Sequence, residues 1–199
     1  MARTRLPGRR EALLAAGERV FTARGEERAT VEEVTAAAGM AKGTFYLYFG
    51  SKNDLLAALR QQFAGELAAA VAAQSGQEGQ DDWFVLARQR LEAAADAFFE
   101  RAGRHEVLFH GAAAGEASES GADWSAAILG GLTELIRAGS AAGAFSVGNP
   151  ELTAVALFHA VYGLFHHGLH HGQSPDRAAL LQAAWELVAR ALGADRIRP

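Results

Sequence analysis

A run of residues at positions 41–52 combines small, polar and cationic side chains with two tyrosines. Side chains of these types donate hydrogen bonds to phosphate oxygens and base edges, and a tyrosine adds an apolar ring that can brace a helix. Small side chains also allow a helix to fit into a DNA groove. The chemistry that this run could perform is therefore the binding of nucleic acid. Its candidate contact residues are Lys42, Gly43, Thr44, Tyr46, Tyr48 and Lys52.

Two short helices joined by a tight turn must position this run. Thr30 and Glu33 form the pattern of a capping box, in which each side chain bonds the backbone amide of the other residue. The pattern predicts a helix over 31–37, closed by Gly39 in the left-handed conformation, and a second helix at about 41–47. Two short helices with a glycine-containing turn are typical of a helix-turn-helix, whose second helix enters the major groove of DNA.

The helices on either side of this pair have clear boundaries. An apolar stripe predicts a helix over 9–24 that ends at Gly25. Ser51 is placed to cap a longer helix, at about 52–73, whose leucine and phenylalanine residues recur at steps of three and four. Lys52 would then lie in the first turn of that helix, where free amides and the helix dipole favour a phosphate.

The remainder of the chain also has helical periodicity, and no alternation of β-branched residues predicts a strand. Pro150 and Pro175 each follow a capping residue and precede an acid, which is a helix-start pattern. The predicted fold class is all-α with about nine helices, made of an N-terminal three-helix domain with the helix-turn-helix and a C-terminal helical bundle. The further helices are expected at 83–101, 104–114, 118–142, 150–171 and 175–192.

Composition and charge restrict the class of protein. The chain has no cysteine, which excludes disulfides, thiolate zinc sites and cysteine nucleophiles. No signal peptide is recognisable, and the apolar runs are interrupted well short of the roughly 20 residues that a membrane span needs. We therefore expect a cytoplasmic protein with no membrane partner and no cofactor.

The net charge of −4 is unevenly divided. Residues 1–60 carry ten basic against seven acidic side chains (+3), and residues 61–199 carry nine against sixteen (−7). A basic segment on an acidic body is typical of a protein whose basic end faces nucleic acid. An excess of this size also arises by chance, so the charge alone does not decide between the two interpretations.

The segment GMAKGTFYLYFGSKNDLL, residues 39–56, resembles the signature of the TetR (tetracycline-repressor-like) family of bacterial transcription regulators. At the level of motifs the resemblance covers residues 8–67, and beyond them it is architectural. It implies a flexible basic arm at 1–7, a tetR-type DNA-binding domain at 8–67 with its helix-turn-helix at about 30–49, and a ligand-sensing and dimerisation domain at 68–199. The DNA contacts that it implies come from Thr30, Lys42, Gly43, Thr44, Tyr46, Tyr48 and Lys52.

Some of these contacts have alternative interpretations. Thr30 serves equally well as an N-cap without a phosphate contact. In the alternative interpretation Tyr48 would be mostly a core aromatic residue with an exposed tip, and Lys42 would be a solvated cation without a contact to a base. The sequence leaves these alternatives open.

A dimer is expected because one helix-turn-helix covers only one half-site of a palindromic operator in double-stranded DNA. The resemblance implies that the last two helices pack against their symmetry mates as a four-helix bundle. Alternatively, parts of these helix faces close only the core of the protomer. The candidate interface residues are Phe158, Leu169, Leu181, Trp185 and Val188.

A ligand pocket is expected between the helices of the C-terminal domain, where bulky aromatic residues lie near glycine- and alanine-rich stretches. The ligand would be a small apolar or aromatic molecule. The alternative is that the aromatic residues form only the core. The candidate pocket residues are Trp83, Phe98, Phe99, Phe109, Trp124, Tyr162 and Phe165.

Four histidines, His166, His167, His170 and His171, form two pairs at a spacing that can hold a metal ion. The pairs point about 100° apart on a straight helix, and no carboxylate lies among them, so we predict no metal site.

Three functions remain in competition. The first is a ligand-responsive DNA-binding regulator, expected to be a repressor that acts as a homodimer. The second is an enzyme that uses Glu106 with His105 or His110, although no catalytic motif accompanies them. The third is a DNA-binding dimer that senses nothing. The sequence favours the first, with no catalytic residue.

Overall fold

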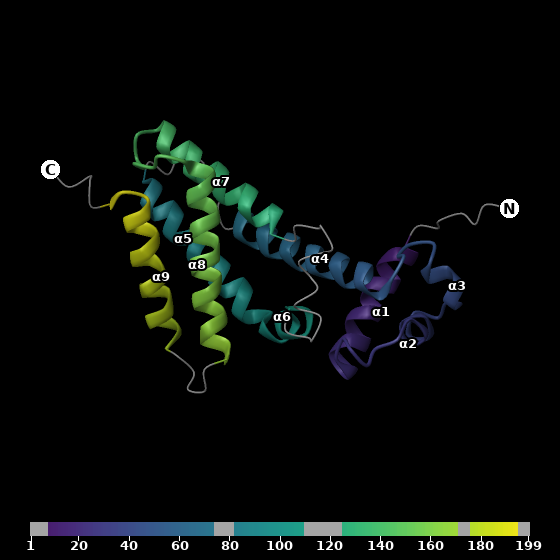
Figure 1. The fold of residues 1–199 in the computed structure, drawn as a ribbon. Helices are drawn as coiled ribbons and strands as arrows, with labels where there is room; N and C mark the ends of the chain where they lie inside the picture. The colour runs from purple at the N-terminus through teal and green to yellow at the C-terminus, as the bar shows by residue number, and fades with distance from the viewer. Residues whose placement is uncertain (1–7, 74–81, 110–124, 171–175, 195–199) are drawn as a thin grey trace. The chain divides into compact units, whose positions relative to one another are not determined.

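The computed structural model describes residues 8–73, 82–109, 125–170 and 176–194, and within them it contains helices and no strand. The predicted all-α fold class is confirmed (Figure 1). The helices are α1 (Arg9–Arg24), α2 (Val31–Ala37), α3 (Lys42–Phe45), α4 (Lys52–Ala73), α5 (Trp83–Glu100), α6 (Ala102–Phe109), α7 (Ala126–Ala141), α8 (Pro150–His170) and α9 (Arg177–Ala191).

The predicted helix starts are largely confirmed by their capping bonds. Ser51 Oγ accepts from the amide of Asp54 at 3.1 Å at the start of α4, and Asn149 Oδ1 accepts from the amide of Leu152 at 2.9 Å at the start of α8. The start of α9 differs from the prediction, because Asp176 rather than Ser174 is the N-cap. Its Oδ1 accepts from the amide of Ala178 at 3.0 Å, since a carboxylate one residue before the helix reaches these free amides.

The chain forms two compact units. Residues 1–64 and 101–124 make the first, which we call the N-terminal unit, and residues 65–100 and 125–199 make the second, which we call the bundle unit. Helix α4 contributes to both. The units differ from the predicted division at residue 67, because α6 packs with the N-terminal helices rather than with the C-terminal domain.

The core of the N-terminal unit is built from the apolar stripes of α1, α2 and α4. Leu13, Phe21 and Leu55 are fully buried in it. Gly17 is required where α1 meets α4, because a Cβ atom there would lie 2.7 Å from Cδ2 of Leu55. The close approach of these two helices fixes the base on which α2 and α3 are held.

Helix α6 is attached to this core by apolar and polar contacts. Leu108 and His105 are buried, and His105 stacks on the ring of Phe109 with centroids 4.9 Å apart. The Nε atom of Arg60 in α4 donates to the carbonyl of Leu108 at 2.6 Å. These contacts explain why α6 belongs to the N-terminal unit.

The bundle unit consists of α5, α7, α8, α9 and the last turns of α4. Its core includes Leu91, Phe98, Ile136, Leu157 and Phe165. Helix α8 packs against both α7 and α9, and α5 packs against α9. The predicted absence of a stretch suited to a membrane does not hold for α8, which is long and apolar enough by length and composition, although only 22% of that stretch is buried in the protomer.

Candidate nucleic-acid interface

The start of α2 is fixed by the capping box that the sequence predicts. The amide of Glu33 donates to Thr30 Oγ1 at 3.2 Å, and the amide of Thr30 donates to Glu33 Oε2 at 3.0 Å. Glu33 also forms an ion pair with Arg24 at the end of α1, at 3.2 Å. After α2 the chain turns at Gly39, whose φ of 66° is left-handed and favours glycine.

Helix α3 is shorter than predicted and consists of Lys42–Phe45, followed by a turn to Phe49. In this turn the amide of Tyr48 donates to the carbonyl of Phe45 at 2.9 Å, which tightens the chain after one helical turn. Phe45 and Phe49 are buried and anchor this segment to the core of the N-terminal unit. Leu47, between them in the chain, is half-buried.

The anchored ring of Phe45 supports Tyr46. Their ring centroids are 5.4 Å apart in an edge-to-face arrangement, and 52% of Tyr46 is exposed. Helix α3 therefore presents a braced tyrosine next to exposed Lys42 and Gly43. Thr44 and Tyr48 are half-buried, and Thr30 is exposed at its cap.

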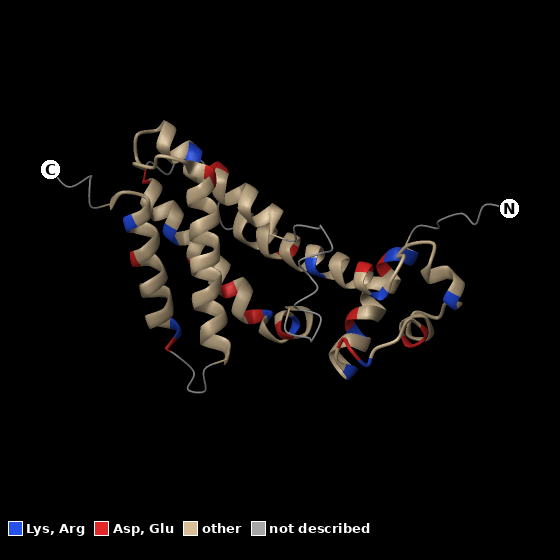
Figure 2. Cartoon of the chain, viewed as in Figure 1, with Lys and Arg blue, Asp and Glu red and all other residues tan. Residues whose placement is uncertain are grey.

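Lys42 is held in an ion pair with Glu32 in the first turn of α2. Figure 2 colours acidic positions red on α2 and a basic position blue on α3. The hydrogen bond between the two side chains raises the pKa of Lys42 and lowers the pKa of Glu32 relative to their ordinary values. Both groups are therefore charged at neutral pH. Sequence reasoning missed Glu32, because the pair is ten residues apart in the chain and meets only through the turn at Gly39.

Lys52 makes a different set of contacts. Its Nζ atom donates to the backbone carbonyls of Glu26 at 2.6 Å, Ala29 at 3.1 Å and Glu27 at 3.3 Å. An ammonium group has three donors, so these carbonyls match its full capacity. In this arrangement Lys52 fixes the turn before α2, and its predicted contact with a phosphate stays a prediction.

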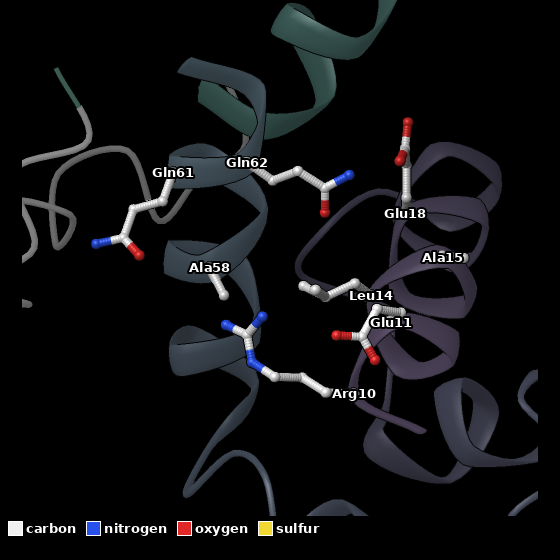
Figure 3. A pocket seen from close by; sticks show the side chains of 8 residues that line it. All are labelled: Arg10, Glu11, Leu14, Ala15, Glu18, Ala58, Gln61 and Gln62. Atoms are coloured by element: carbon white, nitrogen blue, oxygen red, sulfur yellow. The ribbon is translucent and has the colours of Figure 1, made fainter. Parts of the chain in front are cut away.

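Arg10 adds a cationic group that is not among the predicted contact residues. The guanidinium of Arg10 lies over the ring of Phe49, 5.5 Å from its centroid. Arg10 also lines a groove of about 460 Å³ between α1 and α4 (Figure 3). There Leu14 points from α1 toward α4, and Gln62 of α4 extends toward Glu18. The groove is walled by acidic and amide groups as well as by apolar ones.

The predicted ligand residues do not form a single group. Phe98, Phe99, Tyr162 and Phe165 contact one another, with Phe98 to Phe165 at 5.8 Å and Phe98 to Tyr162 at 6.1 Å between centroids. Trp83 lies elsewhere in the bundle unit, where its ring meets Phe145 at 6.2 Å.

Phe109 packs in the N-terminal unit against Phe63, at 5.7 Å between centroids, because α6 belongs to that unit. Trp124 lies outside the described residues. A cavity of about 240 Å³ between α5 and α9 is lined by other residues, among them Arg88, Leu91 and Trp185.

The predicted interface residues lie largely inside the protomer. Phe158 and Val188 are buried, and Leu169, Leu181 and Trp185 are half-buried against the core of the bundle unit. The apolar side chains that α8 and α9 expose are different ones: Leu152 (68% exposed), Val155 and Leu187. The sequence could not separate the two sets, because both recur at helical spacing.

The described histidines of α8 include one close pair. The rings of His166 and His170 lie 4.4 Å apart between centroids, and His171 lies outside the described residues. Among the residues that the structure describes, no three or more potential metal ligands come together.

Comparison with known proteins identifies the family. Residues 13–59 match the family of bacterial regulatory proteins named tetR, and residues 87–188 match the tetracyclin repressor-like C-terminal domain. The chain belongs to the TetR family. The members of this family are bacterial regulatory proteins, which favours a transcription regulator over an enzyme that uses Glu106 with His105 or His110.

The curated relatives of this TetR-family chain match it over part of their lengths. The uncharacterised HTH-type transcriptional regulator YvdT of Bacillus subtilis is 41% identical over 54 residues, which are 27% of this chain and 28% of YvdT. The HTH-type transcriptional activator FasR of Mycolicibacterium smegmatis is 38% identical over 92 residues, 46% of this chain and 39% of FasR. The chain thus matches well under half the length of either relative.

Solved structures share the TetR fold over nearly the whole chain. The fatty acid degradation regulator FadR from Bacillus halodurans has a TM-score of 0.74 at 21% identity, covering 98% of this chain and all of FadR. SmeT, the repressor of the Stenotrophomonas maltophilia multidrug efflux pump SmeDEF, has a TM-score of 0.67 at 20% identity, covering 92% and 89%. At these identities the likeness establishes the fold.

Proposed function

We propose that this TetR-family regulator binds a palindromic operator in double-stranded DNA as a homodimer, and that a small apolar or aromatic molecule releases it. The observation that carries the proposal is α3 itself, on which exposed Lys42 and Tyr46 flank a helical turn anchored by buried Phe45. A groove-reading helix needs this combination of a rigid base and exposed donors. The site residues are Thr30, Lys42, Gly43, Thr44, Tyr46 and Tyr48, with Lys52 behind them.

The proposed domains follow the predicted division, with a basic arm at 1–7, a DNA-binding domain at 8–67 and a sensing and dimerisation domain at 68–199. Helix α6 is the exception, since it packs with the DNA-binding helices. We place the protein in the cytoplasm, where its DNA is.

The homodimer is supported by the apolar face of α8 and α9. Leu152, Val155 and Leu187 are large, apolar and exposed in the protomer, and less than a quarter of the apolar stretch of α8 is buried. A second copy of the chain would cover this face, and a two-fold axis would pair it with itself. We therefore propose that Leu152, Val155 and Leu187 line the interface, together with the predicted residues Phe158, Leu169, Leu181, Trp185 and Val188.

The ligand site is supported by the aromatic group of α5 and α8, which consists of Phe98, Phe99, Tyr162 and Phe165. Rings of this kind line sites for apolar ligands. One observation favours the non-sensing alternative, namely that Phe98 and Phe165 are almost completely buried by their neighbours. A ligand at this position would have to displace ring-to-ring contacts.

Selection of bound fragments from genomic DNA tests the DNA-binding part. We expect recovery of fragments that share an inverted repeat with half-sites one DNA turn apart. Recovery of fragments without a common sequence would overturn the proposal of sequence-specific binding.

Titration of a ligand found by screening, with and without the recovered operator, tests the sensing part. Coupling is reciprocal, so operator DNA should weaken ligand binding by the same factor by which the ligand weakens operator binding. This factor is typically about 5- to 150-fold. Equal ligand affinity in both titrations would leave the DNA-binding dimer without a sensor.

A further inference from the structure

We propose that Glu32 is a specificity-determining residue that holds Lys42 in place and opposes binding to DNA of the wrong sequence. This inference rests on the proposed function of α3. Glu32 lies in the first turn of α2 and Lys42 at the first position of α3, so their ion pair bridges the two helices of the helix-turn-helix. The two side chains are 59% and 53% exposed, which places the pair at the surface.

Glu32 is important because its partner Lys42 lies on the exposed side of α3. Lys42 and Lys52 are the only lysines in the chain, and Lys52 donates to three backbone carbonyls. Lys42 is therefore the lysine of α3 whose ammonium is presented at the surface. The bond to Glu32 uses one of its three donors, and an ammonium can present the others to a base edge or a phosphate oxygen.

A carboxylate at this position has opposite effects on the two kinds of DNA complex. Non-specific binding comes almost entirely from contacts with phosphates, and a negative charge beside the cation weakens it in every register. Specific binding needs the ammonium group of Lys42 at one position, opposite one particular base. Glu32 restricts Lys42 to the neighbourhood of its own carboxylate, which reduces the number of wrong contacts that a free lysine would make.

The ion pair therefore combines the attraction of Lys42 to the operator with the repulsion of the Glu32 carboxylate from phosphates of other DNA sequences. Specificity is a difference between affinities, and a repulsive element contributes to it as much as an attractive one. Charges at the rim of an interface mainly weaken the binding of wrong partners and change the salt dependence of binding. Loss of Glu32 should raise affinity for random DNA more than affinity for operator.

Two other acidic residues near α2, Glu33 and Glu27, have different roles. Glu33 is committed to the capping box and to Arg24. Glu27 is exposed in the turn before α2, where it contributes its backbone carbonyl to Lys52. Glu27→Gln removes the same charge as Glu32→Gln from the same unit without touching the pair, which makes it the matched control.

The experiment compares the parent chain with the Glu32→Gln, Glu27→Gln, Lys42→Ala and Glu32→Gln/Lys42→Ala variants. Affinity is measured for the operator recovered by genomic selection and for a scrambled duplex of the same length, across a range of salt. In the Glu32→Gln variant we expect the ratio of the two affinities to fall about fivefold or more, mainly through tighter binding to the scrambled duplex. The ratio should stay unchanged in Glu27→Gln.

The double variant shows whether Glu32 acts through Lys42. If it does, Glu32→Gln has no further effect on the ratio once Lys42 is alanine, because the side chain that it positions is gone. Thermal unfolding of each variant shows whether it is folded, and Glu32→Ala repeats the measurement if the glutamine keeps a hydrogen bond to Lys42.

The outcomes separate this inference from the function on which it rests. A parent chain that does not distinguish operator from scrambled DNA contradicts the proposed function. A parent chain that distinguishes them, with the same ratio in Glu32→Gln and Glu27→Gln, overturns the role of Glu32. A full effect of Glu32→Gln in the Lys42→Ala background overturns the positioning of Lys42.

Discussion

The N-terminal unit and the bundle unit are both helical, but they use their side chains differently. In the N-terminal unit, polar side chains carry specific tasks: Thr30 and Glu33 cap α2, Lys52 holds a turn, and Lys42 pairs with Glu32. In the bundle unit the important side chains are apolar, and the same types face the core at Phe158 and solvent at Leu152.

This difference decides how each unit responds to substitution. Polar contacts at caps and turns depend on particular atoms, so the residue types that make these contacts, and their spacing, can be recognised in the sequence. Apolar helix faces depend on the volume and area that neighbouring helices cover. Four predictions test the contrast, beginning with the largest expected effect.

Arginine on the exposed face of α8 should separate the dimer. In the Leu152→Arg/Val155→Arg variant we expect a folded monomer, because the new charges lie at the protomer surface but repel across the two-fold axis. Operator affinity should fall by about 100-fold or more, since the second half-site no longer binds intramolecularly. Sedimentation and operator titration measure both effects.

Two further arginine variants serve as references for this face. Phe158→Arg places the charge in the core of the bundle unit, and we expect unfolding rather than a monomer. Gln182→Arg adds a charge to an exposed polar position of α9. A dimer that survives Leu152→Arg/Val155→Arg would show that the interface lies elsewhere.

A single added methyl group should destabilise the bundle unit. A Cβ atom at Gly139 of α7 would overlap the ring of Phe145. We expect Gly139→Ala to lower the free energy of unfolding by about 1–3 kcal/mol, as overpacking does. Chemical denaturation measures this change.

Gly130 in the same helix is the control, because nothing lies within 4 Å of a Cβ atom there. Gly130→Ala should be neutral or stabilising by up to about 1 kcal/mol, since alanine favours the helix. Equal effects at the two glycines would mean that α7 does not pack on Phe145 as described.

The two lysines of the N-terminal unit should differ in the salt dependence of operator binding. Lys42→Ala should flatten the slope of log K against log salt by about one unit if Lys42 contacts a phosphate. Lys52→Ala should weaken binding and lower stability by about 1 kcal/mol, because three carbonyls lose their donor, but leave the slope unchanged. A flattened slope in Lys52→Ala would restore its predicted role as a phosphate contact.

The smallest expected effect is that of the hydroxyl of Tyr46. Tyr46→Phe keeps the ring on Phe45 and removes one donor, so operator affinity should fall by a factor of about five while the melting temperature is unchanged. Tyr48→Phe, at a half-buried position, is the companion variant. Unchanged affinity in both would place the DNA surface away from these tyrosines.

Local signals in the sequence determined the helices and the DNA-binding segment. The capping box at Thr30, the caps at Ser51 and Asn149 and the glycines at 25 and 39 are each read from a few neighbouring residues, and the structure confirms them. The segment of residues 39–56 predicted the family, which the comparison with known proteins bears out. Such features are predictable because their physical cause lies within a few residues.

Only the tertiary structure decided how side chains are shared between distant elements. The sequence assigned Phe109 to a ligand pocket, but α6 packs on α1 and α4, so Phe109 lies with Phe63. It proposed Val188 for the interface, and in the protomer Val188 is buried in the core of the bundle unit. The sequence treated Lys42 and Lys52 alike, as cations. In the structure Lys42 pairs with the carboxylate of Glu32, and Lys52 donates to three backbone carbonyls. Helical periodicity shows that a face is apolar or charged, but only the fold determines which neighbour covers it.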